Sequence, residues 1–180
     1  MDTSPTLDEP SSPPEASDSH QTLHPSIRTI WTIKLIGLTV LFLIVAFFYD
    51  LTHFFSGDSG WLPTGVATIG VIGLGGLYSL IWPRLRYRYW WFALRSEELA
   101  LQRGVLNRVR TVVPLRRIQH LDVSQDLLER EFGLGRLIVH TAGSRSSDVV
   151  IPGLELDEAE RIRDEVKRYI LEDPLMEDPV

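Results

Sequence analysis

Two long apolar runs dominate the first half of the chain. The first extends from Ile30 to Tyr49 and carries one charge, Lys34, near its start. The second extends from Leu62 to Trp82 and carries none. About twenty helical residues at ~1.5 Å rise each cover the ~30 Å hydrocarbon layer of a bilayer. The pattern predicts a two-helix transmembrane hairpin over residues 27–83, with spans at about 30–50 and 62–82.

Details at the ends of these runs fit a membrane location. Lys34 lies one turn inside its run, where its stem can extend to the headgroups. The segment before the first run is too long and too acidic for a signal peptide, and the runs are too long for core helices of a soluble protein. Aromatic residues lie near the ends, as interfacial residues do: Trp31, Tyr49, Trp61 and Trp82. Small residues share one face of the second run and predict a packing seam, either within the hairpin or between copies: Thr64, Thr68, Gly75 and Ser79.

The basic residues predict the orientation of the hairpin. The connecting loop, residues 50–61, contains two aspartates and neither lysine nor arginine. The outer flanks contain Arg28 and Lys34 on one side and Arg84, Arg86 and Arg88 on the other. The positive-inside rule therefore predicts a multi-pass protein with both termini in the cytoplasm.

Strand periodicity replaces the apolar runs from residue 84 onwards. Arginine alternates with leucine and tyrosine over residues 84–89, which predicts a strand there. Further strands are expected on both sides of a turn near Gly104, over 118–125, over 136–143 and after a polar turn over 148–153. Residues 126–133 predict a short helix that stops at Gly133, and residues 156–170 predict an amphipathic helix with an N-cap box at Asp157 and Glu160. The fold class is an α+β, mainly-β barrel or roll of six or seven short strands, capped by a C-terminal helix.

The two ends of the chain differ in composition from the predicted helices and strands. Residues 1–26 contain six serines, five prolines and five acidic residues, with no lysine or arginine. Such a segment buries too little apolar surface to fold, so it is expected to be a disordered acidic tail. His20 and His24 are spaced for a metal on a helix, but solvated side chains are the favoured interpretation because no helix is expected. Residues 173–180 are expected to form a flexible C-terminal tail.

Charge is unevenly distributed. The net charge of −6 argues against nucleic acid as a partner. Residues 84–117 contain nine arginines and two glutamates, a net charge of +7, whereas residues 118–180 have a net charge of −8. The basic part either attracts anionic lipid headgroups or only sets the topology and pairs with the acidic part. The absence of cysteine excludes disulfides, thiolate catalysis and cysteine-ligated metals.

The segment VVPLRRIQHLDVSQ contains the residue types of a hydrolase triad, His120, Asp122 and Ser124. Alternate residues on one strand are ~6.6–6.8 Å apart along its axis, whereas a triad requires contacts of ~2.6–3.2 Å. The three side chains are therefore expected to lie side by side and out of hydrogen-bonding range. His140 on a later strand can approach His120, but no third metal ligand is evident. We predict no catalytic residue, no metal ligand and no cofactor.

The run RGVLNRVRTVVPLRRIQHLDVSQDLLEREFGLGRLIVHTAG, followed by VVIPGL and a helix, resembles the YdbS/YdbT-like family of bacterial membrane proteins. The resemblance covers roughly residues 87–170 and includes the Arg103-Gly104 turn, Val113-Pro114, Phe132-Gly133 and Thr141-Ala142-Gly143. It implies a bacterial pleckstrin-homology-like (PH-like) domain over residues 84–172, built as an antiparallel β-sandwich or roll with a C-terminal helix. It also implies the bacterial inner (cytoplasmic) membrane, and it supplies no active site.

Three functions follow as hypotheses. The first is a non-enzymatic membrane protein that presents its PH-like domain to the cytoplasmic leaflet for a protein partner, for a second copy or family member, or for anionic lipid headgroups. Its candidate contacts are basic: Arg84, Arg86, Arg88, Arg116 and Arg117. The alternatives are a pore or transporter accessory subunit that acts through the hairpin and a membrane-attached hydrolase.

Overall fold

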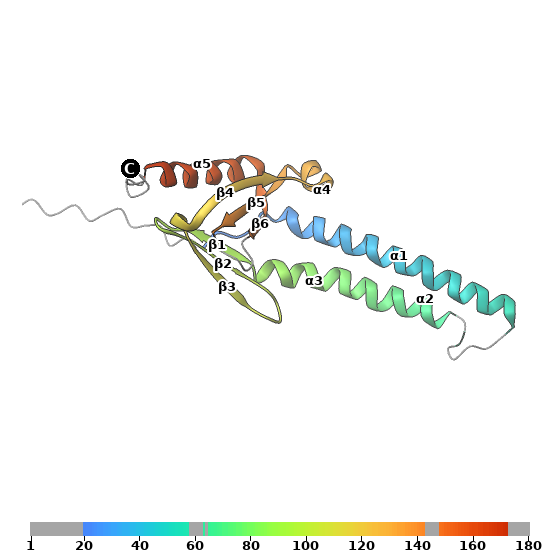
Figure 1. Ribbon diagram of the computed structural model, residues 1–180. Coiled ribbons are helices and arrows are strands. Elements are labelled where there is room, and N and C mark those ends of the chain that lie inside the picture. Colours follow the sequence, from blue (N-terminus) through green and yellow to red (C-terminus); the bar gives the residue numbers. More distant parts are fainter. Residues whose placement is uncertain (1–19, 58–62, 64, 143–147, 173–180) are drawn as a thin grey trace, which may run out of the picture.

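The computed structural model describes residues 20–57, 63, 65–142 and 148–172, and it consists of a long helical hairpin with a β-rich domain at its base (Figure 1). The helical elements are α1 (Ser26–Ser56), α2 (Val66–Gly70), the π-helical η1 (Val71–Gly75), α3 (Gly76–Arg88), the 3₁₀ turn η2 (Leu115–Arg117), α4 (Leu127–Glu131) and α5 (Leu156–Glu172). The strands are β1 (Trp91–Leu94), β2 (Glu98–Arg103), β3 (Val109–Pro114), β4 (Ile118–Ser124), β5 (Leu134–Thr141) and β6 (Asp148–Glu155). The predictions for residues 1–19, for Trp61 and Thr64, for the polar turn at 143–147 and for the tail at 173–180 lie outside the described residues.

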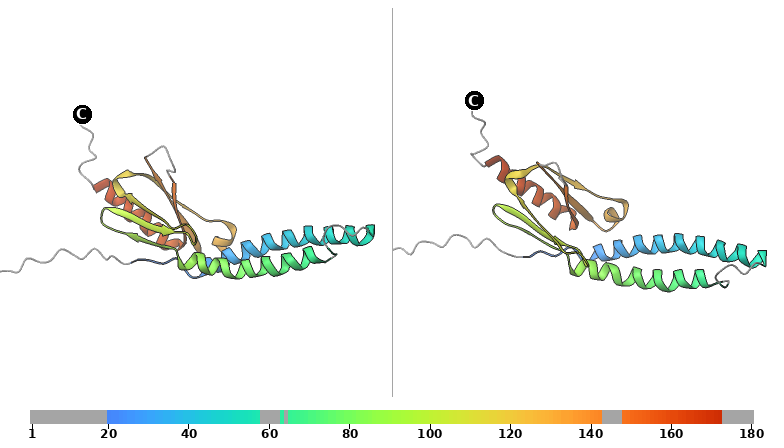
Figure 2. Two further views of the ribbon diagram at one scale, coloured as in Figure 1. Left: turned by 90° about the horizontal axis from the view of Figure 1, so that it is seen from below. Right: turned by 60° about the horizontal axis from the view of Figure 1, so that its bottom comes forward.

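The hairpin pairs α1 with a continuous helix formed by α2, η1 and α3, and the two run side by side (Figures 1 and 2). Both helices are long and apolar enough to cross a membrane. Their outward faces expose large apolar side chains such as Phe42, Val45 and Leu74, which suits contact with lipid. The first helix is longer than predicted at both ends. Asp50 therefore lies within α1 and not in the connecting loop.

Polar and small residues form the seam between the two helices. Thr39 Oγ1 lies 3.1 Å from Ser79 Oγ, and a Cβ atom at Gly75 would lie 2.6 Å from Thr39 Cγ2. Asp50, which is 7% exposed, accepts hydrogen bonds from both the N–H (3.1 Å) and the hydroxyl (2.7 Å) of Thr68. The predicted small-residue face thus packs within the hairpin. Its contacts satisfy a carboxylate and three hydroxyls between two apolar helices, where unpaired polar groups are costly.

The domain contains two three-stranded antiparallel sheets, β1-β2-β3 and β4-β5-β6, with α5 packed on the second. This arrangement confirms the predicted roll with a helical cap. The apolar face of α5 is buried as expected, with Ala159, Ile162 and Val166 at most 3% exposed. The helix begins at Leu156, so Asp157 lies in its first turn and not at the N-cap.

The strand predicted for residues 84–89 is wrong. Residues 84–88 form the last turns of α3, and the first strand begins only at Trp91. Contacts to α1 and to the segment before it hold this end of the helix: the Tyr87 hydroxyl donates a hydrogen bond to the Leu23 carbonyl, 2.8 Å away, and the Arg86 guanidinium lies over the Trp31 ring. Tertiary contacts therefore override a short alternating pattern.

The segment before α1 is ordered from residue 20, which corrects the expectation of disorder as far as residue 26. Gln21 exchanges two backbone hydrogen bonds with Phe92, of 2.8 and 3.0 Å, and thereby extends the edge of the first sheet. The His20 ring stacks on Trp91 with centroids 4.2 Å apart. This segment is ordered because the apolar side chain of Leu23 is buried in the core, with 1% of its surface exposed. The average composition of residues 1–26 is polar and gives no sign of this one buried residue.

The hairpin and the domain share one hydrophobic core. Ile27, Ile30 and Trp31 of α1 belong to the same buried cluster as Phe92 and Leu137 of the two sheets. Gly153 adopts φ +66°, and a Cβ atom there would lie 2.7 Å from Ile27 Cβ. The start of the first helix is therefore part of the domain, which fixes the position of the domain relative to the hairpin.

Candidate membrane-proximal interaction site

The five candidate arginines lie in two separate places. The juxtamembrane arginines (Arg84, Arg86 and Arg88) are exposed on the last turns of α3, where the hairpin meets the domain. The distal arginines (Arg116 and Arg117) are in η2, between β3 and β4. Both views place the connection from β3 to β4 at the end of the domain away from the hairpin (Figures 1 and 2). The two groups therefore lie at opposite ends of the domain.

One juxtamembrane arginine lines a pocket between the hairpin and the domain, here called the junction pocket, of about 320 Å³. Arg86 enters it from α3, with its guanidinium 4.3 Å from the centroid of the Trp31 ring. Trp31 and Trp90 form part of the wall. The charged side chains that line it come from both parts of the molecule: Lys34, Arg86, Arg103, Glu129 and Arg136.

Two of these cations are neutralised within the protein. Lys34 forms an ion pair with Asp126, and Arg136 contacts both Asp126 (2.8 Å) and Glu129 (2.7 Å). Glu129 is 2% exposed, so its pairing with Arg136 removes the cost of a lone buried carboxylate. Within the residues that the structure describes, Arg86 and Arg103 have no carboxylate partner. The pocket therefore keeps an excess of two positive charges.

The local sequence of α4 explains how this network is positioned. Asp126 caps α4 by accepting the Glu129 N–H, while the Glu129 carboxylate accepts the Asp126 N–H, which forms a capping box. Partial burial raises the pKa of the Asp126 carboxyl. The hydrogen bond from Lys34, the Glu129 N–H and the charges of Lys34 and Arg136 outweigh that effect and hold its pKa at about 2. The carboxylate is therefore ionised, and it joins α1, α4 and β5.

A second pocket of about 340 Å³, here called the outer pocket, adjoins the first. It shares Arg86, Trp90 and Arg103 with the junction pocket, and it adds Trp82, Val105 and Val109. It lies between α3 and the turn from β2 to β3. In that turn Gly104 has φ +107°, and a Cβ atom there would lie 1.9 Å from the Asn107 carbonyl oxygen, so only glycine fits. Sequence reasoning identified Arg103 as part of this turn but not as a site residue.

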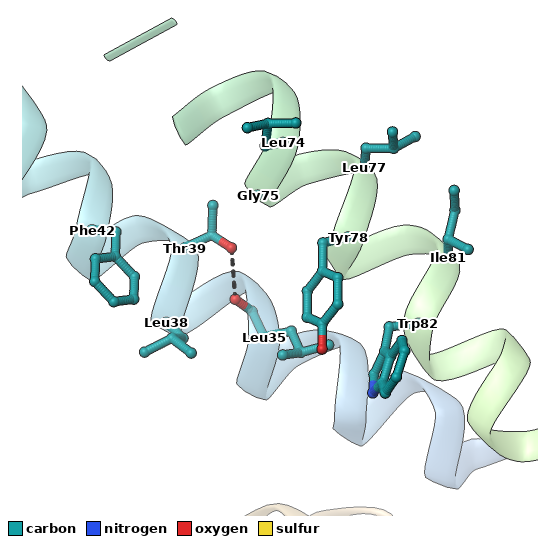
Figure 3. Close-up of a pocket in the computed structure, with 10 residues that line it drawn as sticks. All are labelled: Leu35, Leu38, Thr39, Phe42, Leu74, Gly75, Leu77, Tyr78, Ile81 and Trp82. Carbon is teal, nitrogen blue, oxygen red and sulfur yellow. Dashed lines mark hydrogen bonds between the residues drawn. The ribbon is translucent and has the colours of Figure 1, made fainter. Parts of the chain in front are cut away.

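The helices of the hairpin also enclose a groove of about 640 Å³ (Figure 3). Leu38 and Phe42 of α1 and Leu77 and Ile81 of α3 line it. Tyr78 stacks on Trp82 with centroids 5.3 Å apart. None of its lining residues is charged. This surface suits acyl chains and offers no path for an ion.

The histidines on the second sheet differ from their expected geometry. His120 Nε2 lies 2.7 Å from Asp122 Oδ1, and His140 Nε2 lies 3.3 Å from Asp122 Oδ2. The expectation that His120 and Asp122 are out of range is wrong, because it used backbone spacing whereas long side chains lean along the strand. The approach of His140 to His120 is confirmed, with ring centroids 5.9 Å apart. A bulge between Ile118 and His120 also breaks the alternation, so Ile118 is buried while His120 is exposed.

These contacts do not form a catalytic triad or a metal site. The side chains of His120 and Asp122 are 68% and 49% exposed, and within the described residues no hydrogen bond joins Ser124 to either of them. Within the described part of the chain, no three His, Asp or Glu side chains are arranged to hold a metal ion. His140 Nδ1 instead lies 2.7 Å from Asp148 Oδ1, and this hydrogen bond, with the charges of Asp148 and Asp122, raises the pKa of His140.

A groove of about 300 Å³ lies between the edge strand β4 and α5, here called the distal groove. Apolar Ile118 and Ile170 and basic Arg163 and Lys167 line it. The outer edge of β4 has no pairing strand among the described residues. Such an edge can accept an extended segment of another chain.

These features define a class: a membrane protein whose helical hairpin carries a PH-like domain. The family described as "Bacterial PH domain" matches residues 34–170. The chain belongs to this family.

The chain is also similar to two proteins from Bacillus subtilis (strain 168). The chain is 27% identical over 155 residues to the UPF0699 transmembrane protein YdbS, across 81% of this chain and 89% of that protein. It is 30% identical over 105 residues to the UPF0699 transmembrane protein YdbT, across 54% of this chain and 20% of that protein. A solved DUF1696 family protein with a pleckstrin-homology domain, from Shewanella loihica PV-4, has a TM-score of 0.37 at 15% identity over 54% of this chain and 92% of its own. The two UPF0699 relatives confirm the resemblance to the YdbS/YdbT-like family.

Proposed function

We propose that this chain is a non-enzymatic membrane protein that presents its PH-like domain at the cytoplasmic leaflet, where it binds anionic lipid and a protein partner. The observation that carries the proposal is the shared core at the base of the hairpin, in which Ile27 packs against Gly153. A domain built onto the end of a membrane helix has a fixed face towards the bilayer and a fixed face away from it.

The basic residues support a cytoplasmic position for the domain. Arg28, Lys34 and the juxtamembrane arginines all lie at the end of the hairpin that carries the domain, whereas the other end, at Ser56, has no lysine or arginine nearby in the sequence. Positive-inside reasoning assigns the basic end to the cytoplasm. Both termini are then cytoplasmic, in the inner membrane of a bacterial cell.

The two groups of arginines support two kinds of contact. The juxtamembrane arginines are level with the membrane surface, where each basic residue contributes about 1 kcal/mol of attraction to anionic lipid. The distal arginines and the distal groove face away from the bilayer, where a protein partner can reach them. The edge of β4 suits a second copy or another family member that adds a strand or docks an extended segment.

The alternatives have weaker support. A pore or transporter subunit needs polar groups along the hairpin, but Lys34 pairs with Asp126 of the domain and Asp50 pairs with Thr68. A hydrolase needs a nucleophile beside its base, but Ser124 has no described hydrogen bond to His120. Membership of a PH-domain family favours binding over catalysis.

Cross-linking of the full chain in its native membrane, followed by extraction and mass spectrometry, tests the proposal. Arg116→Glu with Arg117→Glu is expected to remove the cross-linked protein while the anionic lipid is retained. Arg84→Glu, Arg86→Glu and Arg88→Glu together are expected to have the opposite effect. Recovery of neither protein nor anionic lipid with the unmodified chain would contradict it.

A further inference from the structure

The membrane level can be located along the hairpin from its own residues. From Leu35, the residue after Lys34, to Ser56, α1 contains 22 residues and is about 33 Å long at ~1.5 Å per residue, close to the ~30 Å hydrocarbon thickness. Trp31 and Trp82, which are residues of the kind that mark membrane interfaces, lie at the domain-side ends of the two apolar runs. The junction and outer pockets are therefore at the depth of the phospholipid headgroups.

The rim of the domain that faces the hairpin is also built for contact with a bilayer. Most large exposed apolar side chains of the described residues are on the hairpin, and on the domain they are Leu106, Val109, Val112, Leu127 and Phe132. Leu106 is 88% exposed in the β2–β3 turn, and Leu127 is 83% exposed at the start of α4. Both elements project towards the hairpin side of the domain (Figure 1). Their exposure in water would be costly, whereas the interface of a membrane would cover them.

The junction and outer pockets lie between Leu106 and Leu127 and are lined by two arginines that have no carboxylate partner among the described residues. Arg86 and Arg103 come from different parts of the molecule, α3 and β2, and both line both pockets. Two guanidinium groups beside one cavity repel each other unless an anion lies between them. Arginine forks match the geometry of phosphate oxygens. The carboxylate in the junction pocket, Glu129, is already neutralised by Arg136 and does not oppose such an anion.

We propose that Arg86 and Arg103 bind the phosphate of one anionic phospholipid of the cytoplasmic leaflet. The headgroup occupies the junction pocket, and the glycerol and the start of the acyl chains leave through the outer pocket, past Trp82 and Val109. Lys34 and Arg136, which are paired with Asp126 and Glu129, form part of the wall. This inference rests on the proposed function, because it requires the domain to lie at the bilayer surface. It adds that one lipid molecule binds at a defined site, beyond the general attraction between basic residues and anionic lipid.

Native mass spectrometry of the full chain, purified in detergent with added phosphatidylglycerol or phosphatidylcholine, tests the site. The unmodified chain is expected to retain phosphatidylglycerol in preference to phosphatidylcholine. Arg86→Gln with Arg103→Gln is expected to weaken that retention by roughly tenfold or more, since two charges near the headgroup are lost. Arg84→Gln with Arg88→Gln is the matched control, because it removes the same charge from exposed positions on the same helix that line neither pocket. In detergent no bilayer surface supplies the diffuse attraction to these two residues, so the control is expected to lower retention clearly less than Arg86→Gln with Arg103→Gln does.

Further variants keep the test decisive if Arg86→Gln disturbs folding through its contact with Trp31. Arg103→Gln alone removes an exposed side chain with no carboxylate partner among the described residues and is expected to reduce retention. Arg86→Lys keeps the charge but not the fork, and it is expected to retain more lipid than Arg86→Gln and less than the unmodified chain. An equal loss of phosphatidylglycerol retention in both double variants would overturn the site at Arg86 and Arg103 but would still agree with the general lipid attraction of the proposed function. No preference for phosphatidylglycerol in the unmodified chain would overturn both. If inorganic phosphate binds the unmodified chain as tightly as the lipid does and displaces the lipid when added in excess, the assignment to a lipid is overturned.

Discussion

Lys34 of the first membrane helix forms an ion pair with Asp126, the residue that caps α4 in the PH-like domain. The two residues are 92 positions apart in the sequence. The ammonium was expected to extend to lipid headgroups, and it instead joins the hairpin to the domain. Together with the shared core at Ile27, this contact holds the domain in one position relative to the hairpin.

Replacement of Lys34 is expected to have a small but specific effect on stability. Both side chains are partly exposed, so Lys34→Met should lower the free energy of unfolding by about 0.2–1 kcal/mol. Thermal unfolding of the purified full chain in detergent measures it. The same replacement in an Asp126→Asn background should cost less, because the partner is already absent. Equal costs in both backgrounds would mean that the pair contributes nothing.

Stability should depend on pH through Asp126. Its pKa of about 2 is below the ordinary value of 3.8, so its ionised form stabilises the fold. That contribution is complete above the ordinary value and is lost as the pH falls through about 2. Lys34→Met should raise the pKa of Asp126 towards 3.8, and carboxyl ¹³C NMR over an acid titration measures the change. An unchanged pKa in this variant would rule out Lys34 as a cause.

Gly153 should be the more sensitive of two glycines that have the same backbone conformation. Gly133 and Gly153 both have φ +66°, but a Cβ atom added at Gly153 would meet Ile27, whereas one added at Gly133 would have no neighbour within 4 Å. Gly133→Ala should cost only the left-handed strain, about 1–2 kcal/mol. Gly153→Ala should add an overpacking cost of about 1–3 kcal/mol. Similar melting temperatures for the two variants would contradict tight docking of the domain on α1.

The buried carboxylate of Glu129 should matter more than its exposed neighbour Glu131. Glu129→Gln leaves Arg136 without its full charge partner, which should cost about 1–3 kcal/mol. The figure is below that of a fully buried pair because the Arg136 side chain is 31% exposed. Glu131→Gln, at an exposed position, should change the melting temperature little. A neutral result for Glu129→Gln would show that the network does not support α4.

The spacing of apolar residues predicted correctly the helices and strands that have one regular apolar face. It failed where contacts with residues distant in the sequence determine the secondary structure. The apolar runs, the turn at Gly104 and the buried face of α5 follow from local pattern. Residues 84–88 alternate like a strand, yet contacts of Arg86 and Tyr87 with α1 and the segment before it keep them helical. The anchoring of the tail through Leu23 depends on a core that is formed by residues much later in the chain.

The candidate site was predicted only in part for the same reason. The basic character of residues 84–117 is visible in the sequence, and Arg86 was among the named residues. The selection of Arg103 as its partner depends on where the β2–β3 turn lies relative to α3. The neutralisation of Lys34 and Arg136 depends on the capping box at Asp126, which joins three elements that are distant in the sequence.

The most direct test of the account is the side of the membrane on which the domain lies. The chain has no cysteine, so single variants report without background. Glu165→Cys places a thiol on the exposed face of α5, and Ser56→Cys places one at the far end of α1. A membrane-impermeant maleimide should label Glu165→Cys only in inverted membrane vesicles and Ser56→Cys only in right-side-out vesicles, with both labelled after permeabilisation. Labelling of Glu165→Cys in sealed right-side-out vesicles would contradict a PH-like domain held at the cytoplasmic leaflet.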